Sequence, residues 1–257
     1  MFLKLGYGRV VILPLEKEVY SVNYQSVFKR YEIKYLIDRK QKERILEAMA
    51  PYMELDQYGR TEIRNIYFDT DSFRLIRHSI EKPAYKEKLR IRCYGKAKMG
   101  SSVFVEVKKK YDHVVYKRRL SMMEKNAMKW IAGDRSYDNS CQIAREMAYF
   151  RDYYGTLRPA VFLSYEREAY RSLNGNDFRV TFDDNILCRQ TGLSLTEEIY
   201  GEPILEEGKV LMEIKTTGGI PLWMTHLLTK EHIYKTSFSK YGTAYQKFIL
   251  PKWKGEC

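Results

Sequence analysis

The sequence predicts an α+β fold in which strands with one charged face are combined with helices that have recognisable ends. Two observations predict this class: charged and apolar residues alternate with a period of two in several short segments, and capping residues open longer amphipathic segments. The 257 residues contain no internal repeat and no Pro/Gly/Ser-rich linker. We therefore expect one domain over residues 24–250, preceded by a segment at 1–23 and followed by a tail at 251–257.

The alternating segments define the expected strands. In the first of them Arg30, Glu32 and Lys34 are charged, and the residues between them are apolar. Because side chains of a strand point alternately to its two faces, each segment has one charged and one apolar face. The other segments of this kind are Lys86–Cys93, Val103–Lys108, the residues around Lys117 and Arg119, Leu163–Arg167, Arg179–Asp183 and Met212–Lys215.

Helices are predicted where a capping or first-turn residue precedes apolar residues at helical spacing. Asp38 is such a cap, and Ile45, Leu46 and Met49 share one helix face after it. Ser121 with Glu124 has the spacing of a capping box, and glycines are expected at helix ends. The predicted helices are 38–53, 121–133 ending at Gly133, 139–154 ending before Gly155, 221–230 with Pro221 in the first turn, and 239–250.

The charged strand faces admit two interpretations. In a half-buried sheet they would meet water. However, most of their polar positions are Lys or Arg, whereas a solvated face would mix Thr, Ser, Glu and Lys. Alternatively, the sheet closes into a barrel, the charged faces line its interior and the helices cover its apolar outside. Because unpaired buried charges are unfavourable, such an interior would require a polyanion.

The net charge of +12, from 45 Lys and Arg against 33 Asp and Glu, suits nucleic acid, an anionic membrane or a phosphorylated small molecule. Charge that alternates within strands disfavours nucleic acid, whose binding surfaces gather charge on loops or one helix face. Cys93, Cys141, Cys188 and Cys257 show no zinc spacing, and no apolar run suffices for a signal peptide or membrane span. We expect a soluble cytoplasmic protein with reduced thiols.

A set of motifs occurs in a characteristic order along the chain: Arg30-Tyr31-Glu32-Ile33-Lys34-Tyr35, Tyr67-Phe68-Asp69-Thr70, Leu89-Arg90-Ile91-Arg92, Val105-Glu106-Val107-Lys108, Lys117-Arg118-Arg119, Tyr165-Glu166-Arg167, Arg179-Val180-Thr181-Phe182-Asp183 and Met212-Glu213-Ile214-Lys215. Together they resemble the VTC domain, the catalytic module of vacuolar-transporter-chaperone polyphosphate polymerases. This domain belongs to the triphosphate tunnel metalloenzyme (CYTH-like) superfamily. The resemblance covers residues 27–248 and implies an eight-stranded antiparallel β-barrel, a triphosphate tunnel, with helices packed on the outside.

The resemblance also implies roles for individual residues. Glu213 is expected to bind a divalent metal, Mn²⁺ or Mg²⁺, and Glu106 either to assist that metal or to orient a neighbouring lysine. Tyr165 is expected near the nucleotide, by stacking or hydrogen bonding, or simply packed. The catalytic set is Lys34, Arg90, Arg92, Lys108, Arg167 and Glu213, and the phosphate-binding set further includes Lys88, Lys117, Arg119, Arg179, Lys215 and Lys240.

One motif departs from the superfamily pattern. The wider superfamily has an ExExK strand with two metal-binding glutamates, but Arg30 stands here at the first position and leaves Glu32 and Lys34. The change removes one metal ligand, puts a second metal site in doubt and resembles the polymerase-type VTC domains rather than the simple triphosphatases.

The function that the resemblance implies is that of a polyphosphate polymerase. It would transfer the terminal phosphoryl group of ATP to a growing polyphosphate chain, with pyrophosphate or phosphate as the first acceptor. The alternatives are a metal-dependent triphosphatase or polyphosphatase and a non-catalytic polyphosphate-binding module. Because phosphate is the nucleophile, no catalytic Ser, Cys or His is needed, and His78, His113, His226 and His232 are expected to be structural or at the surface. A separate membrane protein would have to transport any product.

Overall fold

The computed structural model describes residues 30–98 and 100–255. The predicted N-terminal segment at 1–23 lies outside these ranges, as do the last two residues of the predicted tail. The strands are β1 (Tyr31–Asp38), β2 (Met53–Asp69), β3 (Tyr85–Tyr94), β4 (Ser102–Tyr111), β5 (Val114–Met123), β6 (Arg158–Ser172), β7 (Arg179–Arg189), β8 (Glu202–Pro203), β9 (Lys209–Thr216) and β10 (Lys235–Thr236). The helices are α1 (Arg39–Met49), α2 (Arg74–Ile80), α3 (Glu124–Ile131), α4 (Gln142–Tyr154), α5 (Leu222–Lys230), α6 (Lys240–Ala244), the π-helical segment η1 (Tyr245–Ile249) and α7 (Leu250–Gly255).

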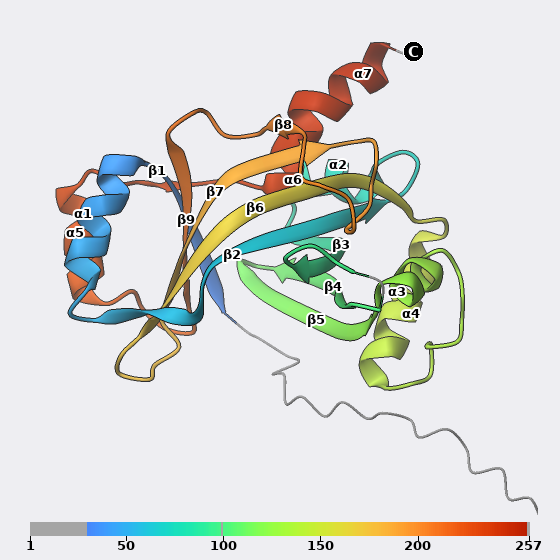
Figure 1. The fold of residues 1–257 in the computed structure, drawn as a ribbon, viewed down its shortest axis with the longest axis horizontal. Coiled ribbons are helices and arrows are strands. Elements are labelled where there is room, and N and C mark those ends of the chain that lie inside the picture. The colour runs from blue at the N-terminus through green and yellow to red at the C-terminus, as the bar shows by residue number, and fades with distance from the viewer. Residues whose placement is uncertain (1–29, 99, 256–257) are drawn as a thin grey trace, which may run out of the picture.

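The strands form one ten-stranded antiparallel sheet with the order β10-β1-β9-β7-β6-β2-β3-β4-β5, and β8 pairs with β7. The sheet curls strongly, so that β1 approaches β5 (Figure 1). An isolated backbone bridge joins Arg30, which directly precedes β1, to β5: the Val115 N–H donates to the Arg30 carbonyl at 3.2 Å. The α+β class with an antiparallel sheet is confirmed. The predicted closed barrel of eight strands is wrong, because the sheet formed by the described residues is open and has ten strands.

The open sheet follows from the way in which β1 is paired. β9 pairs with β1 along its whole length on one edge, from Tyr31 to Asp38. On the other edge, β10 pairs with Lys34 and Tyr35. Only the start of β1 therefore remains to meet β5, and the two strands form a seam instead of a ladder.

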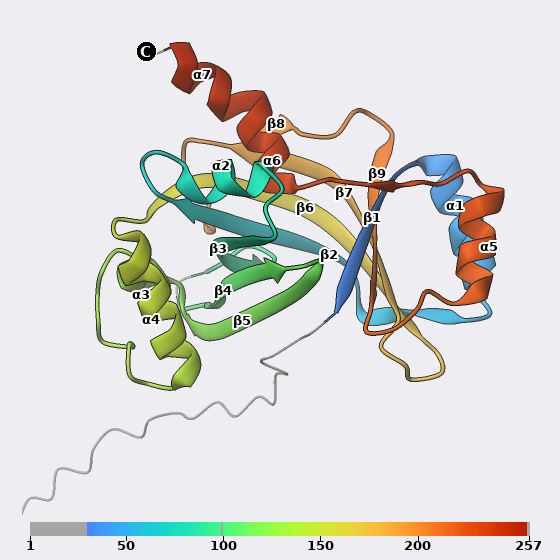
Figure 2. The same cartoon turned by 180° about the vertical axis from the view of Figure 1, so that it is seen from behind.

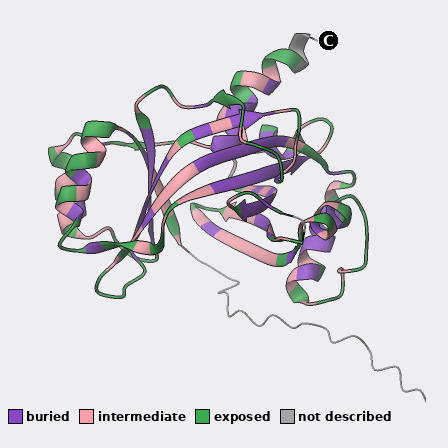
Figure 3. Cartoon of the chain, viewed as in Figure 1, coloured by how far each residue is buried: buried purple, intermediate pink, exposed green. Residues whose placement is uncertain are grey.

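The predicted alternation of charged and apolar faces is confirmed. Val103, Val105 and Val107 of β4 are buried in a hydrophobic cluster with residues of α3 and α4, whereas Glu106 between them carries ion pairs on the other face. A second cluster packs α1 and α5 against β1, β7 and β9. These four helices cover the convex side of the curled sheet, and Figure 3 shows the buried central strands between them.

The remaining helices correct the expectation that all helices lie outside. Ile76 of α2, Tyr241 of α6 and Tyr245 of η1 form a third cluster with Leu163 and Leu211. Leu163 and Leu211 have the same strand parity as the charged residues further along β6 and β9, so α2, α6 and η1 pack on the concave side (Figure 2). The concave face is therefore apolar at one end and charged over the rest.

Some predicted helix ends are confirmed and others need correction, among them the end of the first helix, which stops at Met49, so that Met53 opens β2. Asp38 forms a capping box with Gln41 at the start of α1, and α4 ends at Gly155, whose φ is 70°. Ser121 does not cap α3, because β5 continues through Met123 and the helix begins directly at Glu124. Pro221 is the N-cap of α5 and lies just before its first turn.

The predicted last helix begins as expected at its Ser239 cap but is longer and less regular than predicted. The Ser239 hydroxyl accepts the Gly242 N–H, and helical structure continues through η1 and α7 to Gly255. It thus includes part of the predicted tail. None of the helices in residues 30–98 and 100–255 is both long and apolar enough to span a membrane. Cys93, Cys141 and Cys188 are free thiols.

Candidate functional site

The charged residues of the concave face form one continuous group, here called the concave-face cluster. They come from β1, β3, β4, β5, β6, β7 and β9 and from the start of α6, which the curl of the sheet brings together. Its cations are Lys34, Lys88, Arg90, Arg92, Lys108, Lys117, Arg119, Arg167, Lys215 and Lys240, and its carboxylates are Glu32, Glu106, Asp183 and Glu213.

Glu106 is the shared counterion of the cations on β3 and β5. Arg90 donates to its Oε2 at 2.7 and 2.9 Å, Arg119 donates to its Oε1 at 2.6 Å, and the Lys117 ammonium lies 3.5 Å from Oε1. The strand register explains these pairs, because Glu106 is opposite Arg90 on one side and Arg119 on the other. Burial alone would raise the pKa of Glu106, but the surrounding cations hold it well below its usual range.

Asp183 and Glu213 organise the cations at the other side of the cluster. Arg167 donates two hydrogen bonds to Asp183, at 2.5 and 2.6 Å, and Lys240 also donates to Asp183. The ammonium of Lys215 lies 3.0 Å from Glu213, and those of Lys34 and Lys240 lie 3.5 and 3.6 Å away. Glu213 therefore faces cations from β1, β9 and α6. Although burial would raise its pKa, these cations lower it well below the usual value.

The third part of the cluster lies along the seam between β1 and β5. Glu32 of β1 pairs with Lys108 of β4 across this seam. Lys34 donates to the Phe238 carbonyl at 2.7 Å, and Lys88 donates to the Ser239 hydroxyl at 2.7 Å. Phe238 and Ser239 directly precede α6, so the start of this helix places neutral acceptors among the lysines.

The cluster has more cations than carboxylates; the pKa values of several of its lysines are lowered, whereas, against the effect of burial, Asp183 and Glu213 raise the pKa of Lys240. Burial, and then the neighbouring Lys34 and Lys108, lower the pKa of Lys88 well below its usual value. Burial is also the main reason why the pKa of Lys117 and that of Lys215 fall to about 7. The arrangement thus holds positive charge close together, in a place that a bound polyanion would stabilise.

Comparison with known proteins identifies the family. The family model described as the VTC domain matches residues 29–249. The chain belongs to the VTC domain family. No curated protein matches it.

Among solved structures, 34 chains are similar to this VTC domain. One is from Hippeastrum, a candidate adenylyl cyclase for which a dominant triphosphatase activity is described; it has 17% sequence identity and a TM-score of 0.50 over 86% of this chain and 98% of its own. Another is a candidate adenylate cyclase from Bacillus halodurans, with 15% identity and a TM-score of 0.49 over 87% of this chain and 99% of its own. At these identities the likeness concerns the fold, which is the triphosphate tunnel fold.

Most of the phosphate-binding residues predicted for the VTC domain lie in the concave-face cluster. Arg179 is opposite Lys215 in the β7–β9 ladder, but its guanidinium lies 3.8 Å from Asp56 and its side chain is 44% exposed, so it lies at the margin of the cluster. Tyr165 is buried inside it: its hydroxyl accepts from Arg92 at 2.8 Å, and the Lys240 ammonium lies 4.5 Å from its ring centroid.

Sequence reasoning missed several residues that hold the arginines in place. Asn65 accepts from Arg92 at 2.8 Å, and the Tyr67 hydroxyl accepts from Arg90 at 2.9 Å. Both belong to β2, where Asn65 and Tyr67 alternate with Ile66 and Phe68. This alternation with a period of two could have indicated that Asn65 and Tyr67 face the charged side of the sheet. The four histidines are exposed and lie outside the cluster, as predicted.

The carboxylates of the cluster are the candidate ligands for a divalent metal. No group of three or more His, Cys, Asp or Glu side chains in residues 30–98 and 100–255 is arranged to hold a metal ion. Glu106 is completely buried among four cations. The expected lysine partner is Lys117 at 3.5 Å, but the shorter hydrogen bonds come from Arg90 and Arg119. Glu213 lies diagonally across the β1–β9 ladder from Glu32, so two carboxylates are available there. Such a pair fits a cation that takes its other ligands from phosphate, as Mg²⁺ commonly does.

Proposed function

We propose that this VTC domain is a polyphosphate polymerase that transfers the terminal phosphoryl group of ATP to the end of a polyphosphate chain. The observation that carries the proposal is the excess of cations in the concave-face cluster, where arginines and lysines from six strands and α6 surround Glu32, Glu106, Asp183 and Glu213. Phosphate oxygens would supply the missing counter-charges and would bind these cations through charge-assisted hydrogen bonds.

The chain's own residues would align the phosphates and neutralise their charge, which is most of what phosphoryl transfer requires. Arg90, Arg92 and Arg167 are held by acceptors on neighbouring strands. Because a guanidinium has five N–H donors, each arginine keeps donors for phosphate oxygens. Lys34, Lys88 and Lys108 would act as point charges along the path of the chain. The acceptor phosphate is itself the nucleophile.

A divalent metal, Mn²⁺ or Mg²⁺, would be held by Glu213, with Glu32 as a second oxygen donor. When bound, it would neutralise charge on the transferred phosphoryl group. Lys34 and Lys215 flank both carboxylates in the β1–β9 ladder and would orient them.

Hydrolysis of triphosphate is the second candidate function. It is favoured by the fold shared with the Hippeastrum protein, for which a dominant triphosphatase activity is described. The two reactions would use the same cations and carboxylates and would differ in the acceptor, which is water for the hydrolase and phosphate for the polymerase. Products therefore separate them.

The experiment is to incubate the purified protein with ATP, pyrophosphate and Mn²⁺ or Mg²⁺, and to resolve the products by length on a gel. Ladders of long chains together with ADP are expected. Orthophosphate without chains would contradict the polymerase and support the hydrolase. Polyphosphate binding without any turnover would indicate a non-catalytic binding module. That a separate membrane protein takes up the product stays a prediction.

The variant that tests the site is Glu213→Gln, which keeps the size of the side chain and removes its charge. We expect activity to fall by at least about a hundredfold, because a charged ligand is lost at the centre of the reaction. The matched control is Glu206→Gln, a change at an exposed glutamate outside the cluster, which should leave activity unchanged. Full activity in Glu213→Gln would exclude this residue from the mechanism.

A further inference from the structure

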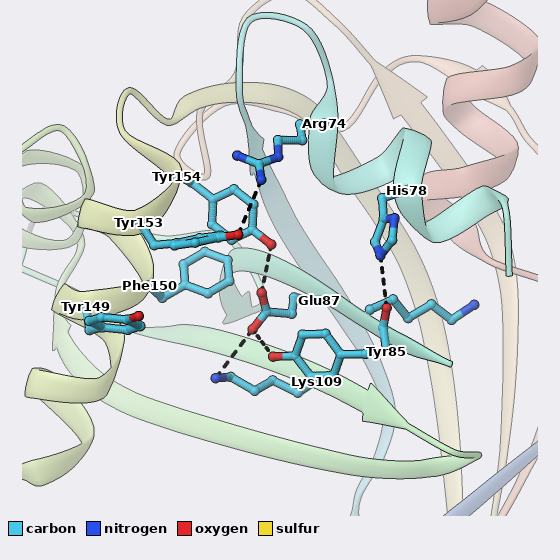
Figure 4. Close-up of a pocket in the computed structure, with 10 residues that line it drawn as sticks. Arg74, His78, Tyr85, Glu87, Lys109, Tyr149, Phe150, Tyr153 and Tyr154 are labelled. Atoms are coloured by element: carbon cyan, nitrogen blue, oxygen red, sulfur yellow. Dashed lines mark hydrogen bonds and ion pairs between the residues drawn. The ribbon is translucent and has the colours of Figure 1, made fainter. Parts of the chain in front are cut away.

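A separate cavity lies at the rim of the sheet, where β3 begins. Its volume is about 440 Å³, and residues of α2, β3, β4 and α4 line it (Figure 4). α2 packs on the concave side of the sheet and α4 on the convex side. The cavity therefore lies at the edge of the sheet, at the start of β3, and is lined by residues from both the concave and the convex side.

The walls of this cavity offer accessible aromatic rings. Tyr149 and Tyr153 follow each other on successive turns of α4 and are 72% and 58% exposed. The Arg74 guanidinium lies 5.4 Å from the ring centroid of Tyr153 and 5.3 Å from that of Tyr154. Flat rings beside a guanidinium plane are the surfaces on which nucleobases stack.

The floor of the cavity is a buried carboxylate. Glu87 accepts hydrogen bonds from the hydroxyls of Tyr85 and Tyr154, and the ammonium of Lys109 lies 3.4 Å away (Figure 4). An ionised carboxylate has about four acceptor positions, so these three donors leave capacity for a further N–H group. The cavity thus combines stacking surfaces, positive charge and an acceptor for an exocyclic amine.

One residue connects this cavity with the concave-face cluster. Lys86 lines the cavity, and in β3 it shares the concave face with Lys88, two residues further on. Two residues of a strand span about 7 Å. A triphosphate that contacts Lys88 can therefore have its nucleoside end at Lys86, from which the cavity continues around the start of β3 to Glu87 and α4 on the other face of the strand.

We propose that this cavity binds the nucleoside part of a nucleoside triphosphate, with the base stacked on Tyr149 and Tyr153 and its amino group directed to Glu87. With this site the protein would bind a nucleoside triphosphate more tightly than an inorganic triphosphate. The inference rests on the proposed function, in that the triphosphate itself occupies the concave-face cluster.

The test compares the affinities of ATP and of inorganic tripolyphosphate, measured by calorimetry without turnover, in wild-type protein and Tyr149→Ala. Loss of one stacking partner should weaken ATP binding by about tenfold. Tripolyphosphate has no nucleoside, so its affinity should not change. The matched control is Tyr58→Ala, since Tyr58 is also 72% exposed but lies outside the cavity.

Each other outcome would overturn the inference. Unchanged ATP affinity in both Tyr149→Ala and Tyr153→Ala would show that the cavity does not hold the nucleoside. Equal weakening of both ligands would show that the change acts through the concave-face cluster. Because both measurements are of binding, they decide the matter even if the protein polymerises nothing, and failure of the polymerase assay leaves them intact.

Discussion

Lys215 and Lys117 are residues of the concave-face cluster whose charge is expected to change near neutral pH. Burial lowers the pKa of each from 10.5 to about 7. In the unfolded chain both would keep their ordinary values, so the unfolded state binds more protons between pH 7 and 10. These lysines therefore make the free protein more stable as pH rises through this range. A bound polyanion has the opposite preference, because it favours the charged lysines.

Polyphosphate affinity should accordingly fall as pH rises from 6.5 to 8.5. Each lysine that must take up a proton on binding weakens the affinity by up to about tenfold per pH unit above its pKa. Calorimetry in two buffers of different ionisation enthalpy would measure both the affinity and the proton uptake. The Lys215→Met variant should show a weaker dependence of polyphosphate affinity on pH. Because titration of the ligand affects both proteins equally, the difference between wild type and variant reports the titration of Lys215. Affinity that does not vary with pH in the wild-type protein would contradict this account.

At the scale of single residues, the sequence predicted which side chains face the charged side but not which partners they meet. The parity of β3 and β4 placed Arg90, Arg92 and Glu106 together, because register carries parity from strand to strand. It could not indicate that Lys34 and Lys88 contact the residues before α6, because those residues are far away in the chain. Such contacts depend on the path of the whole chain.

Among the elements, α1 offers the clearest test of a local signal. The Asp38 carboxylate accepts the Gln41 N–H at 2.8 Å, and the Gln41 side chain accepts the Asp38 N–H at 3.0 Å. Asp38→Ala should lower the free energy of unfolding by about 1 kcal/mol. For a chain of this size the melting temperature should fall by about 2–4 °C, which calorimetry can measure.

The same substitution should leave polyphosphate binding unchanged, because α1 packs on the convex side of the sheet. Loss of binding in a folded Asp38→Ala protein would show that the two faces are coupled. An unchanged melting temperature would show that the capping box contributes nothing to stability.

The elements also show where local signals fail. Ser121 and Glu124 have the spacing of a capping box, yet Ser121 lies opposite Phe104 in the β4–β5 ladder. The ladder hydrogen bonds and the burial of Met122 hold the chain extended to Met123, so tertiary structure overrides the local preference. Asp38 succeeds as a signal because the end of β1 and the start of α1 coincide at that residue.

For the whole molecule, the sequence predicted strands with one charged face, and the resemblance to the VTC domain implied an antiparallel barrel of eight strands, but neither predicted the way in which the edges of the sheet meet. The edge of β1 is shared between β10 and the single bridge to β5. The sequence could not predict this open seam. β10, which occupies part of the edge of β1, has only two residues, too few to show a periodic pattern. The seam is nevertheless functionally placed, since the Glu32–Lys108 ion pair crosses it inside the concave-face cluster.

A polyanion bound to the cluster should hold the two sides of this seam together. It would contact Lys34 on β1, Lys108 on β4 and Lys117 on β5. These lysines repel one another in the free protein, and each would be attracted to the bound polyanion. Hydrogen exchange should therefore slow in β5 (Val114–Met123) and at the start of β1 when long-chain polyphosphate is added. We expect at least about tenfold protection at saturating ligand, because binding to the folded state suppresses local opening.

The internal reference is α1, where exchange should change little because its helix lies on the convex side. High salt should reduce the protection in β5 together with the affinity, since screening weakens both by the same mechanism. If β5 exchanged equally fast with and without saturating polyphosphate, the ligand would not bridge the seam, and the open edge would be a permanent feature of the fold. Protection confined to β5 and β1 would instead mean that the tunnel completes its wall only around its substrate.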